Sequence, residues 1–388
     1  MLKLIKNGTV LTPKGFIKAD ILICNEKIIC INAAITTSDL TLPYEELDAS
    51  DQFVLPGIID QHVHLIGGGG ESGFSSRTPE VQVSKLVKAG ITSVLGLLGT
   101  DSATRHVESL YAKAKALNEE GISAYMVTGS YRVPSPTITD SVYKDVVFID
   151  TVLGCKIAIA DHRASHPSVE ELIRIASEVR VASMLANKPG IIVVHMGNSK
   201  KTLHLIDQVL ESSDIPIKHF LPTHVNRNAY LLKDAIEFAL KGGNIDLTSG
   251  IDPYLGANGA INPSKAVIQA LEAGVNLEQL TLSSDGNGSI PEFDANGNIS
   301  GMGVAGFDSL LNTIRELVAA GLPLDKSWNT VSNNVASRLK LDDRGCLDTN
   351  KMADLVFLNQ ADLALTLTMA KGKVLFKQGE YCVKGTFE

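Results

Sequence analysis

An alternation of apolar segments with amphipathic ones fills the middle of the chain and limits its possible folds more than any other feature. The apolar segments are 54–64, 91–99, 123–130, 152–160, 190–197, 220–226, 244–250 and 279–285. Helical spacing lies between them, as in 78–89, 106–120, 169–186, 201–211, 231–241 and 264–273. Strands that alternate with helices are typical of a parallel sheet, and eight repeats predict a (β/α)₈ TIM-like barrel. A doubly wound open sheet is the alternative, but no Gly-x-Gly-x-x-Gly motif follows the first strand.

The two ends of the chain differ from the middle. Residues 1–53 and 346–388 contain short strand patterns separated by turn residues, such as Ala19–Ile23 and Lys373–Phe376. Chain ends that belong to one domain often lie close together in space. We therefore expect both ends to pair into one small β-sandwich domain, with residues 54–345 forming the barrel.

The composition disfavours several classes of partner. The 388-residue chain has a formal charge of −8 and no basic stripe with interleaved aromatic residues, so we expect no nucleic-acid partner. No uncharged apolar segment is long enough to span a bilayer, and the N-terminal residues lack the apolar core of a signal peptide, so we expect no membrane partner. The five cysteines are scattered and odd in number, which is typical of a reducing compartment. These features predict a cytoplasmic protein.

Metal-binding side chains follow the predicted strands. His62 and His64 end the first strand, and residues two apart on a strand share a face, so they can bind one ion from the same side. Later strands carry Thr100, Tyr131, Lys156, His195, His224 and Asp285 within them or at their ends. The carboxyl ends of barrel strands are where active sites lie. The other histidines stand in predicted helices and loops, where capping, packing or solvation explains them.

Four imidazoles and a carboxylate suit a divalent ion such as Zn²⁺. The set is too large for one catalytic zinc with an open position, but it suits two ions about 3.5–4 Å apart. As an ammonium, Lys156 would repel both ions; carboxylated by CO₂, it becomes an anionic bridge. Taken alone, Lys156 is more simply a buried, ion-paired lysine. In a metal-free aldolase it would form a Schiff base, but that reading leaves four histidines without a role.

The order His-x-His, Lys, His, His, Asp along the barrel resembles the amidohydrolase superfamily. Longer motifs resemble its isoaspartyl dipeptidase family, and the resemblance extends over essentially the whole chain. These motifs are Gly67–Glu71, Leu98–Asp101, Thr128–Tyr131, Asp161–Arg163, His195–Gly197, Pro222–Asn228 and Ser283–Ser289. The resemblance implies a homo-oligomeric peptidase that hydrolyses the isopeptide bond of β-aspartyl dipeptides by attack of a metal-bridging hydroxide.

The resemblance also implies a role for each side chain at the strand ends. His62 and His64 bind one ion, His195 and His224 the other, carboxylated Lys156 bridges them, and Asp285 binds the first. Asp285 would also take the proton of the attacking water and deliver it to the leaving amine, and Tyr131 would hydrogen-bond the developing oxyanion. Plain ligation or helix capping by Asp285, and simple packing of Tyr131, fit the local sequence equally well.

Charged residues beyond the strands predict the substrate. A β-aspartyl dipeptide carries an α-ammonium group and two carboxylates. Glu71, in a glycine-rich loop, suits the ammonium, and Arg163 and Arg227 suit the carboxylates. Thr100 and Ser289 are candidate hydrogen-bonding residues. The simpler interpretations are surface ion pairs for the arginines and a tight turn for the glycines.

Two further alternatives remain open within the superfamily. A cyclic amide hydrolase of the dihydroorotase or hydantoinase type would keep the metal ligands and change the substrate. A catalytically dead scaffold would usually have lost ligands, whereas this chain keeps all six.

Overall fold

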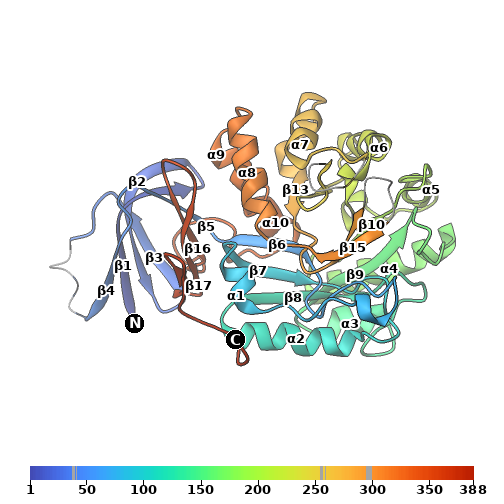
Figure 1. Ribbon diagram of the computed structural model, residues 1–388, viewed down its shortest axis with the longest axis horizontal. Helices are drawn as coiled ribbons and strands as arrows, with labels where there is room; N and C mark the ends of the chain where they lie inside the picture. Colours follow the sequence, from blue (N-terminus) through green and yellow to red (C-terminus); the bar gives the residue numbers. More distant parts are fainter. Residues whose placement is uncertain (37–39, 41, 254–256, 258, 294–298) are drawn as a thin grey trace.

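The computed structural model describes residues 1–388 apart from 37–39, 41, 254–256, 258 and 294–298. Two large sheets organise the described chain. One is a parallel sheet in the middle of the sequence that is covered by helices, and the other is a nine-stranded sheet built from both chain ends. Figure 1 shows the two along the long axis of the molecule.

The parallel strands follow one another around the curled sheet in sequence order. They are β6 (Ile58–Val63), β7 (Ile91–Gly96), β8 (Ser123–Gly129), β9 (Val152–Ile159), β10 (Ile191–Met196), β11 (Phe220–Thr223), β12 (Ile245–Thr248) and β13 (Leu280–Ser283). The first six are hydrogen-bonded in order, and β12 pairs with β13. The chain after β13 returns to β6, because Gly286 forms a parallel bridge with Val63. This arrangement fits a TIM-like barrel, as the sequence predicts for the middle of the chain.

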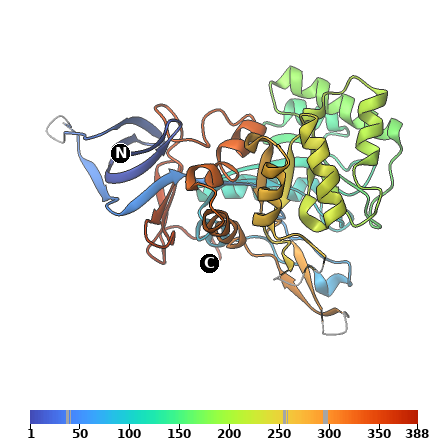
Figure 2. The ribbon, with the colours of Figure 1, turned by 90° about the horizontal axis from the view of Figure 1, so that it is seen from above.

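Helices cover the outside of the parallel sheet (Figures 1 and 2). They are α1 (Val83–Val87), α2 (Val107–Glu120), α3 (Val142–Phe148), α4 (Val169–Ala186), α5 (His204–Ser212), α6 (Ala229–Leu240), α7 (Pro263–Glu272), α8 (Ser309–Ala319), α9 (Leu324–Asn329) and α10 (Asn333–Arg338). The bounds predicted for α4 are correct, because Ser168 and Glu171 form a capping box at its start and Asn187, with φ 52°, ends it.

One helix is shorter than its sequence pattern predicts. The pattern covers 78–89, whereas α1 begins at Val83. The preceding residues serve a loop instead, because the Thr78 hydroxyl accepts a hydrogen bond from the Gly68 N–H at 2.7 Å and donates one to the Asn287 carbonyl at 2.8 Å. Tertiary hydrogen bonds therefore keep residues 78–82 out of the helix that the sequence pattern predicts.

Alternation along β10 explains why polar chemistry collects at one end of the barrel. Ile191, Val193 and His195 alternate with outward-facing residues. Ile191 and Val193 pack inside the barrel in an apolar cluster with Val335 and Leu339, from α10 and the residue after it. Apolar side chains thus fill the interior near the strand starts, and His195 stands at the opposite end.

The nine-stranded sheet joins the two ends of the chain. Its strands are β1 (Leu2–Thr12), β2 (Gly15–Cys24), β3 (Lys27–Asn32), β4 (Tyr44–Asp48), β5 (Gln52–Pro56), β16 (Leu355–Asn359), β17 (Leu365–Ala370), β18 (Lys373–Lys377) and β19 (Glu380–Tyr381). Strand β5 links the halves by pairing with β1 on one side and β16 on the other. A division into domains at residues 53 and 346 stays a prediction.

A hairpin of β14 (Ser289–Phe293) and β15 (Ile299–Val304) follows the last barrel strand. It lies beside the glycine-rich loop that contains the short helix η2 (Phe74–Ser76), as Figure 2 shows for the orange hairpin and its blue neighbour. Among the described residues, no helix combines the length and hydropathy needed to cross a bilayer.

Candidate metal-binding active site

The six predicted ligands lie at the carboxyl end of the barrel. His62 is in β6, His64 follows it, Lys156 is in β9, His195 is in β10, His224 follows β11, and Asp285 follows β13. His224 and Asp285 both have left-handed backbone conformations, with φ of 63° and 54°. A left-handed turn within two residues of the strand end lets each side chain depart from the strand alternation, and both lie in the ligand cluster.

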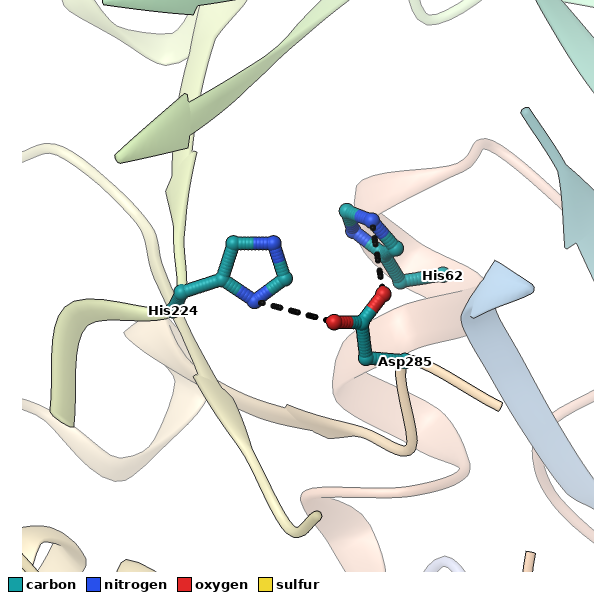
Figure 3. Close-up of side chains that lie close together, drawn as sticks. All are labelled: His62, His224 and Asp285. Carbon is teal, nitrogen blue, oxygen red and sulfur yellow. Dashed lines mark ion pairs between the residues drawn. The ribbon is translucent and has the colours of Figure 1, made fainter. Parts of the chain in front are cut away.

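Asp285 is at the centre of the cluster (Figure 3). Its Oδ1 lies 3.1 Å from the Nε2 of His64 and 3.4 Å from the Nε2 of His62. Its Oδ2 lies 3.9 Å from the Nδ1 of His224. Donor atoms of His62, His224 and Asp285 all lie within 4.8 Å of one another, which is close enough for one ion to contact all three.

Lys156 is fully buried within this cluster. Its Nζ lies 3.0 Å from the Nε2 of His62, and none of its surface is exposed. Burial lowers the pKa of Lys156 to about 7, although nearby carboxylates oppose the change. A substantial fraction of the amine is therefore neutral near neutral pH, and a neutral amine is the form that reacts with CO₂.

His195 and His224 form the other side of the cluster. Their ring centroids are 4.8 Å apart, and those of His224 and His62 are 4.7 Å apart. The Nδ1 of His224 is 2.8 Å from the Thr248 hydroxyl, and the Nδ1 of His195 is 2.6 Å from the Tyr131 hydroxyl. The predicted ligands and the predicted oxyanion donor are thus brought together.

The electrostatics of the cluster favour metal ligation. Burial, reinforced by the charge of Lys156, lowers the pKa of His62 well below its usual value. Burial likewise lowers the pKa of His195 to about 3 and the pKa of His224 well below 6.5. Burial acts to raise the pKa of Asp285, but the hydrogen bond with His64 and the nearby positive charges hold it below its usual value. Neutral imidazoles and an ionised carboxylate are the forms that bind a divalent ion.

Three of the predicted recognition residues form a connected group at the edge of the cluster. The Glu71 carboxylate accepts a hydrogen bond from Thr100 at 2.9 Å and one from Nη1 of Arg163 at 3.2 Å. Burial lowers the pKa of Arg227, whose Nε has no hydrogen-bond partner among the described residues. Ser289 lies beside Gly69, because a Cβ added to Gly69 would be 3.1 Å from the Cβ of Ser289.

Sequence reasoning assigned no role to several residues behind the ligands. Asp161 contacts His195 with its Oδ2 at 2.9 Å, and Thr248 contacts His224. Deeper in the barrel, Asp246 accepts hydrogen bonds from Gln61 and Ser283 at 2.8 and 2.6 Å. Burial raises the pKa of Asp246 to about 6. Apart from the position of Asp161 within a recognised motif, no signal in the sequence marks these residues, because their partners lie on other strands.

The family model of the amidohydrolases matches residues 53–375. Because this match covers most of the chain, the chain belongs to the amidohydrolase family and is a hydrolase. It is similar over its whole length to the β-aspartyl dipeptidase of Fervidobacterium islandicum AW-1, solved as a crystal structure with a β-Asp-Leu dipeptide. The TM-score is 0.89 at 39% identity, with 98% of each chain covered. The resemblance found in the sequence is therefore confirmed.

Other relatives are more distant. A dihydroorotase of Staphylococcus aureus is 36% identical over 118 residues, which span 30% of this chain and only 26% of the dihydroorotase. The dihydropyrimidinase of Brevibacillus agri has a TM-score of 0.68 at 17% identity, with 99% of this chain and 97% of that one covered. The latter similarity concerns the fold alone.

Proposed function

We propose that this chain is a binuclear-metal peptidase that hydrolyses the isopeptide bond of β-aspartyl dipeptides. The observation that carries the proposal is an ion pair, Glu71 with Arg163, at the edge of a buried cluster of metal-ligand side chains. A β-aspartyl residue with free α-amino and α-carboxylate groups presents a cation and an anion side by side, and it complements such a pair. The relative crystallised with β-Asp-Leu supports the same substrate class.

The donors present fit two divalent ions, and their nitrogen and oxygen atoms favour Zn²⁺. His62, His64 and Asp285 would hold one ion, His195 and His224 the other, and Lys156, as its CO₂-derived carbamate, would stand between them. When bound, the ions would lower the pKa of a shared water and polarise the scissile carbonyl.

Asp285 and Tyr131 would carry out the proton transfer and charge stabilisation. The Asp285 carboxylate is ionised and faces the cluster, so it can accept the proton of the attacking water and pass it to the leaving amine. The Tyr131 hydroxyl points into the same space, and burial raises its pKa, so it stays protonated as a donor. One donor to a developing oxyanion contributes about 3 kcal/mol.

Recognition would use the charged groups around the cluster. Glu71, supported by Thr100, would bind the α-ammonium. Arg163 and Arg227 would bind the carboxylates. The Arg227 guanidinium is partly desolvated, so its interaction with a carboxylate would be strong. Ser289, beside the glycine-rich loop, would add a hydrogen bond.

A paired substrate assay tests the proposal. We expect release of aspartate from β-Asp-Leu but not from α-Asp-Leu, together with about two equivalents of divalent metal per chain by elemental analysis. Glu71→Gln should raise KM at least about tenfold, because it leaves the substrate ammonium without a counter-charge. Glu80→Gln is the matched control, since Glu80 pairs with Lys113 outside the site. Equal cleavage of both peptides would contradict the proposed specificity.

A cyclic amide hydrolase is the second candidate. The local similarity to a dihydroorotase favours it, although that similarity covers only about a third of the chain. Dihydroorotate carries a carboxylate but no free ammonium, so Glu71 would have no partner in that complex. Turnover of dihydroorotate in preference to β-Asp-Leu would reverse the choice.

Three broader predictions accompany this function. We propose that residues 1–53 and 346–388 form a small β-domain beside the barrel at 54–345. A homo-oligomeric state and a cytoplasmic location remain predictions of the sequence and its resemblance.

A further inference from the structure

Asp161 lies between the predicted metal centre and the predicted recognition group. Its Oδ2 is 2.9 Å from the Nε2 of His195. Arg163 binds the same carboxylate with two side-chain nitrogens, Nε to Oδ1 at 3.0 Å and Nη2 to Oδ2 at 2.8 Å. The backbone N–H of Arg163 adds a third hydrogen bond to Oδ1 at 2.8 Å. One carboxylate therefore contacts both a candidate metal ligand and a candidate substrate ligand.

The surrounding backbone fixes Asp161 in this position. The residue is 5% exposed, and the preceding Ala160 has a φ of 54°, which directs the chain off the end of β9. A Cβ added to Gly197 would lie 2.4 Å from the Asp161 Cα and 2.5 Å from its Cβ. The backbone of the β10 extension thus packs directly against Asp161, two residues after His195.

The contact with Asp161 determines which nitrogen of His195 carries the proton. An ionised carboxylate only accepts hydrogen bonds, so the proton of the neutral imidazole is on Nε2. The Nδ1 then presents its lone pair toward the Tyr131 hydroxyl and the interior of the cluster. A metal ligand needs a lone pair on this side, and the partner of the opposite nitrogen fixes it.

The same carboxylate orients Arg163. With Nε and Nη2 held by Asp161, Nη1 points to Glu71 at 3.2 Å. A guanidinium fixed by two parallel hydrogen bonds loses little further entropy when it binds a substrate carboxylate.

We propose that Asp161 is a positioning residue that couples the metal centre to substrate recognition, by fixing the His195 tautomer and the Arg163 side chain with one carboxylate. This inference rests on the proposed function, because it takes His195 as a metal ligand and Arg163 as a substrate ligand. It extends that function to a residue that is not itself one of the proposed metal or substrate ligands.

Counting acceptors shows why an amide cannot replace this carboxylate. Two donors face Oδ1 of Asp161 and two face Oδ2. An asparagine offers one acceptor oxygen and one donor nitrogen. If its oxygen replaces Oδ2, the Nε and backbone N–H of Arg163 face a donor. If it replaces Oδ1, His195 and Nη2 face a donor, and His195 must move its proton to Nδ1.

The test combines metal binding with kinetics in four variants. In Asp161→Asn we expect metal affinity, measured by competition of Zn²⁺ with a chromophoric chelator, to fall about 10- to 100-fold, and KM for β-Asp-Leu to rise about tenfold or more. Arg163→Gln should raise KM with metal affinity unchanged. The double variant Asp161→Asn/Arg163→Gln should show the loss of metal affinity of Asp161→Asn, and its KM should be no higher than that of Arg163→Gln alone. Asp234→Asn is the matched control, because this half-buried carboxylate also accepts a side-chain hydrogen bond, from Thr202, but contacts neither His195 nor Arg163.

Each outcome decides for or against the coupling. A defect in metal affinity alone, or in KM alone, overturns it, because Asp161 would then serve one partner only. Asp161→Ala is a second variant in case the amide prevents folding, and loss of the fold in both makes the residue structural and also overturns the proposal. Wild-type protein that binds no metal and cleaves no β-Asp-Leu refutes the proposed function instead, so the two failures are distinguishable.

Discussion

Two threonine hydroxyls each contact the Nδ1 atom of a candidate metal-binding histidine, and the different lengths of these two contacts lead to a quantitative prediction. The Thr248 hydroxyl lies 2.8 Å from Nδ1 of His224, and the Thr223 hydroxyl lies 3.3 Å from Nδ1 of His62. Both threonines are fully buried at strand ends. Thr→Val is nearly isosteric and removes only the hydroxyl, so the pair Thr248→Val and Thr223→Val compares a short hydrogen bond with a long one.

The magnitude follows from what each substitution leaves unpaired. When His224 binds an ion through Nε2, its proton must be on Nδ1, and in Thr248→Val that buried N–H has no acceptor. An unsatisfied buried donor costs about 1–3 kcal/mol, which corresponds to a loss of about 5- to 150-fold in metal affinity. The bond between Thr223 and His62 is near the outer limit of hydrogen-bond length, so its loss should change affinity less than about threefold.

Chelator competition with Zn²⁺ measures both affinities, and melting curves of the same samples check that the fold is intact. We expect a clear ranking, with Thr248→Val well below wild type and Thr223→Val close to it. Equal affinities in the two variants, or a larger loss in Thr223→Val, would refute the argument that the Thr248 hydroxyl accepts the Nδ1 proton of His224.

Three other substitutions test separate parts of the molecule. Asp285→Asn should keep the fold and lower kcat by about two to four orders of magnitude, and wild-type turnover would remove Asp285 from the mechanism. Lys156→Ala should lose metal and activity together, with partial rescue by short-chain carboxylates, and elemental analysis that finds unchanged metal would refute the bridge. Asp20 is far from the site; burial tends to raise its pKa, but hydrogen bonds from Lys6 and two backbone N–H groups lower it overall. A lowered carboxyl pKa stabilises the fold above the unfolded value of about 3.9, and the effect is lost as the pH falls through the folded value. Asp20→Asn should therefore lower the free energy of unfolding at pH 7, and denaturant titrations should show this difference shrink as the pH falls through the folded pKa of Asp20.

Much of the barrel could be predicted from the sequence because its signals are local. Each strand is a short apolar run bounded by turn residues, and the predicted ranges contain the observed strands, as 190–197 contains Ile191–Met196. The bounds of α4 were predictable because Ser168, Glu171 and Asn187 mark them within a few residues. The short α3 at Val142–Phe148 was not predicted, since seven residues give little periodicity.

The candidate ligands could be predicted for the same reason, whereas their partners could not. Whether His62 or His195 ends a strand is visible in its own segment. Strand alignment and the turns after the strands determine that Thr248 contacts His224 and that Asp161 contacts His195. Alignment alone places Ala158, not Asp161, opposite His195, and the positive φ of Ala160 brings Asp161 back toward the ring. A left-handed alanine has no distinct sequence signal.

The hydrogen-bond partners of the histidines, which the sequence does not reveal, affect which imidazole nitrogen is available to bind a metal ion. Histidines at strand ends provide donors, but a neutral imidazole has two tautomers, and only one presents a lone pair to the centre. The structure gives the Nδ1 of His62 and His224 a threonine hydroxyl and the Nε2 of His195 a carboxylate. His195 is therefore oriented in the opposite sense to the other two, and its partner is the one that also holds Arg163. A chain that kept the histidines but lost Asp161 would retain the metal-ligand motif and lose the link between metal and substrate.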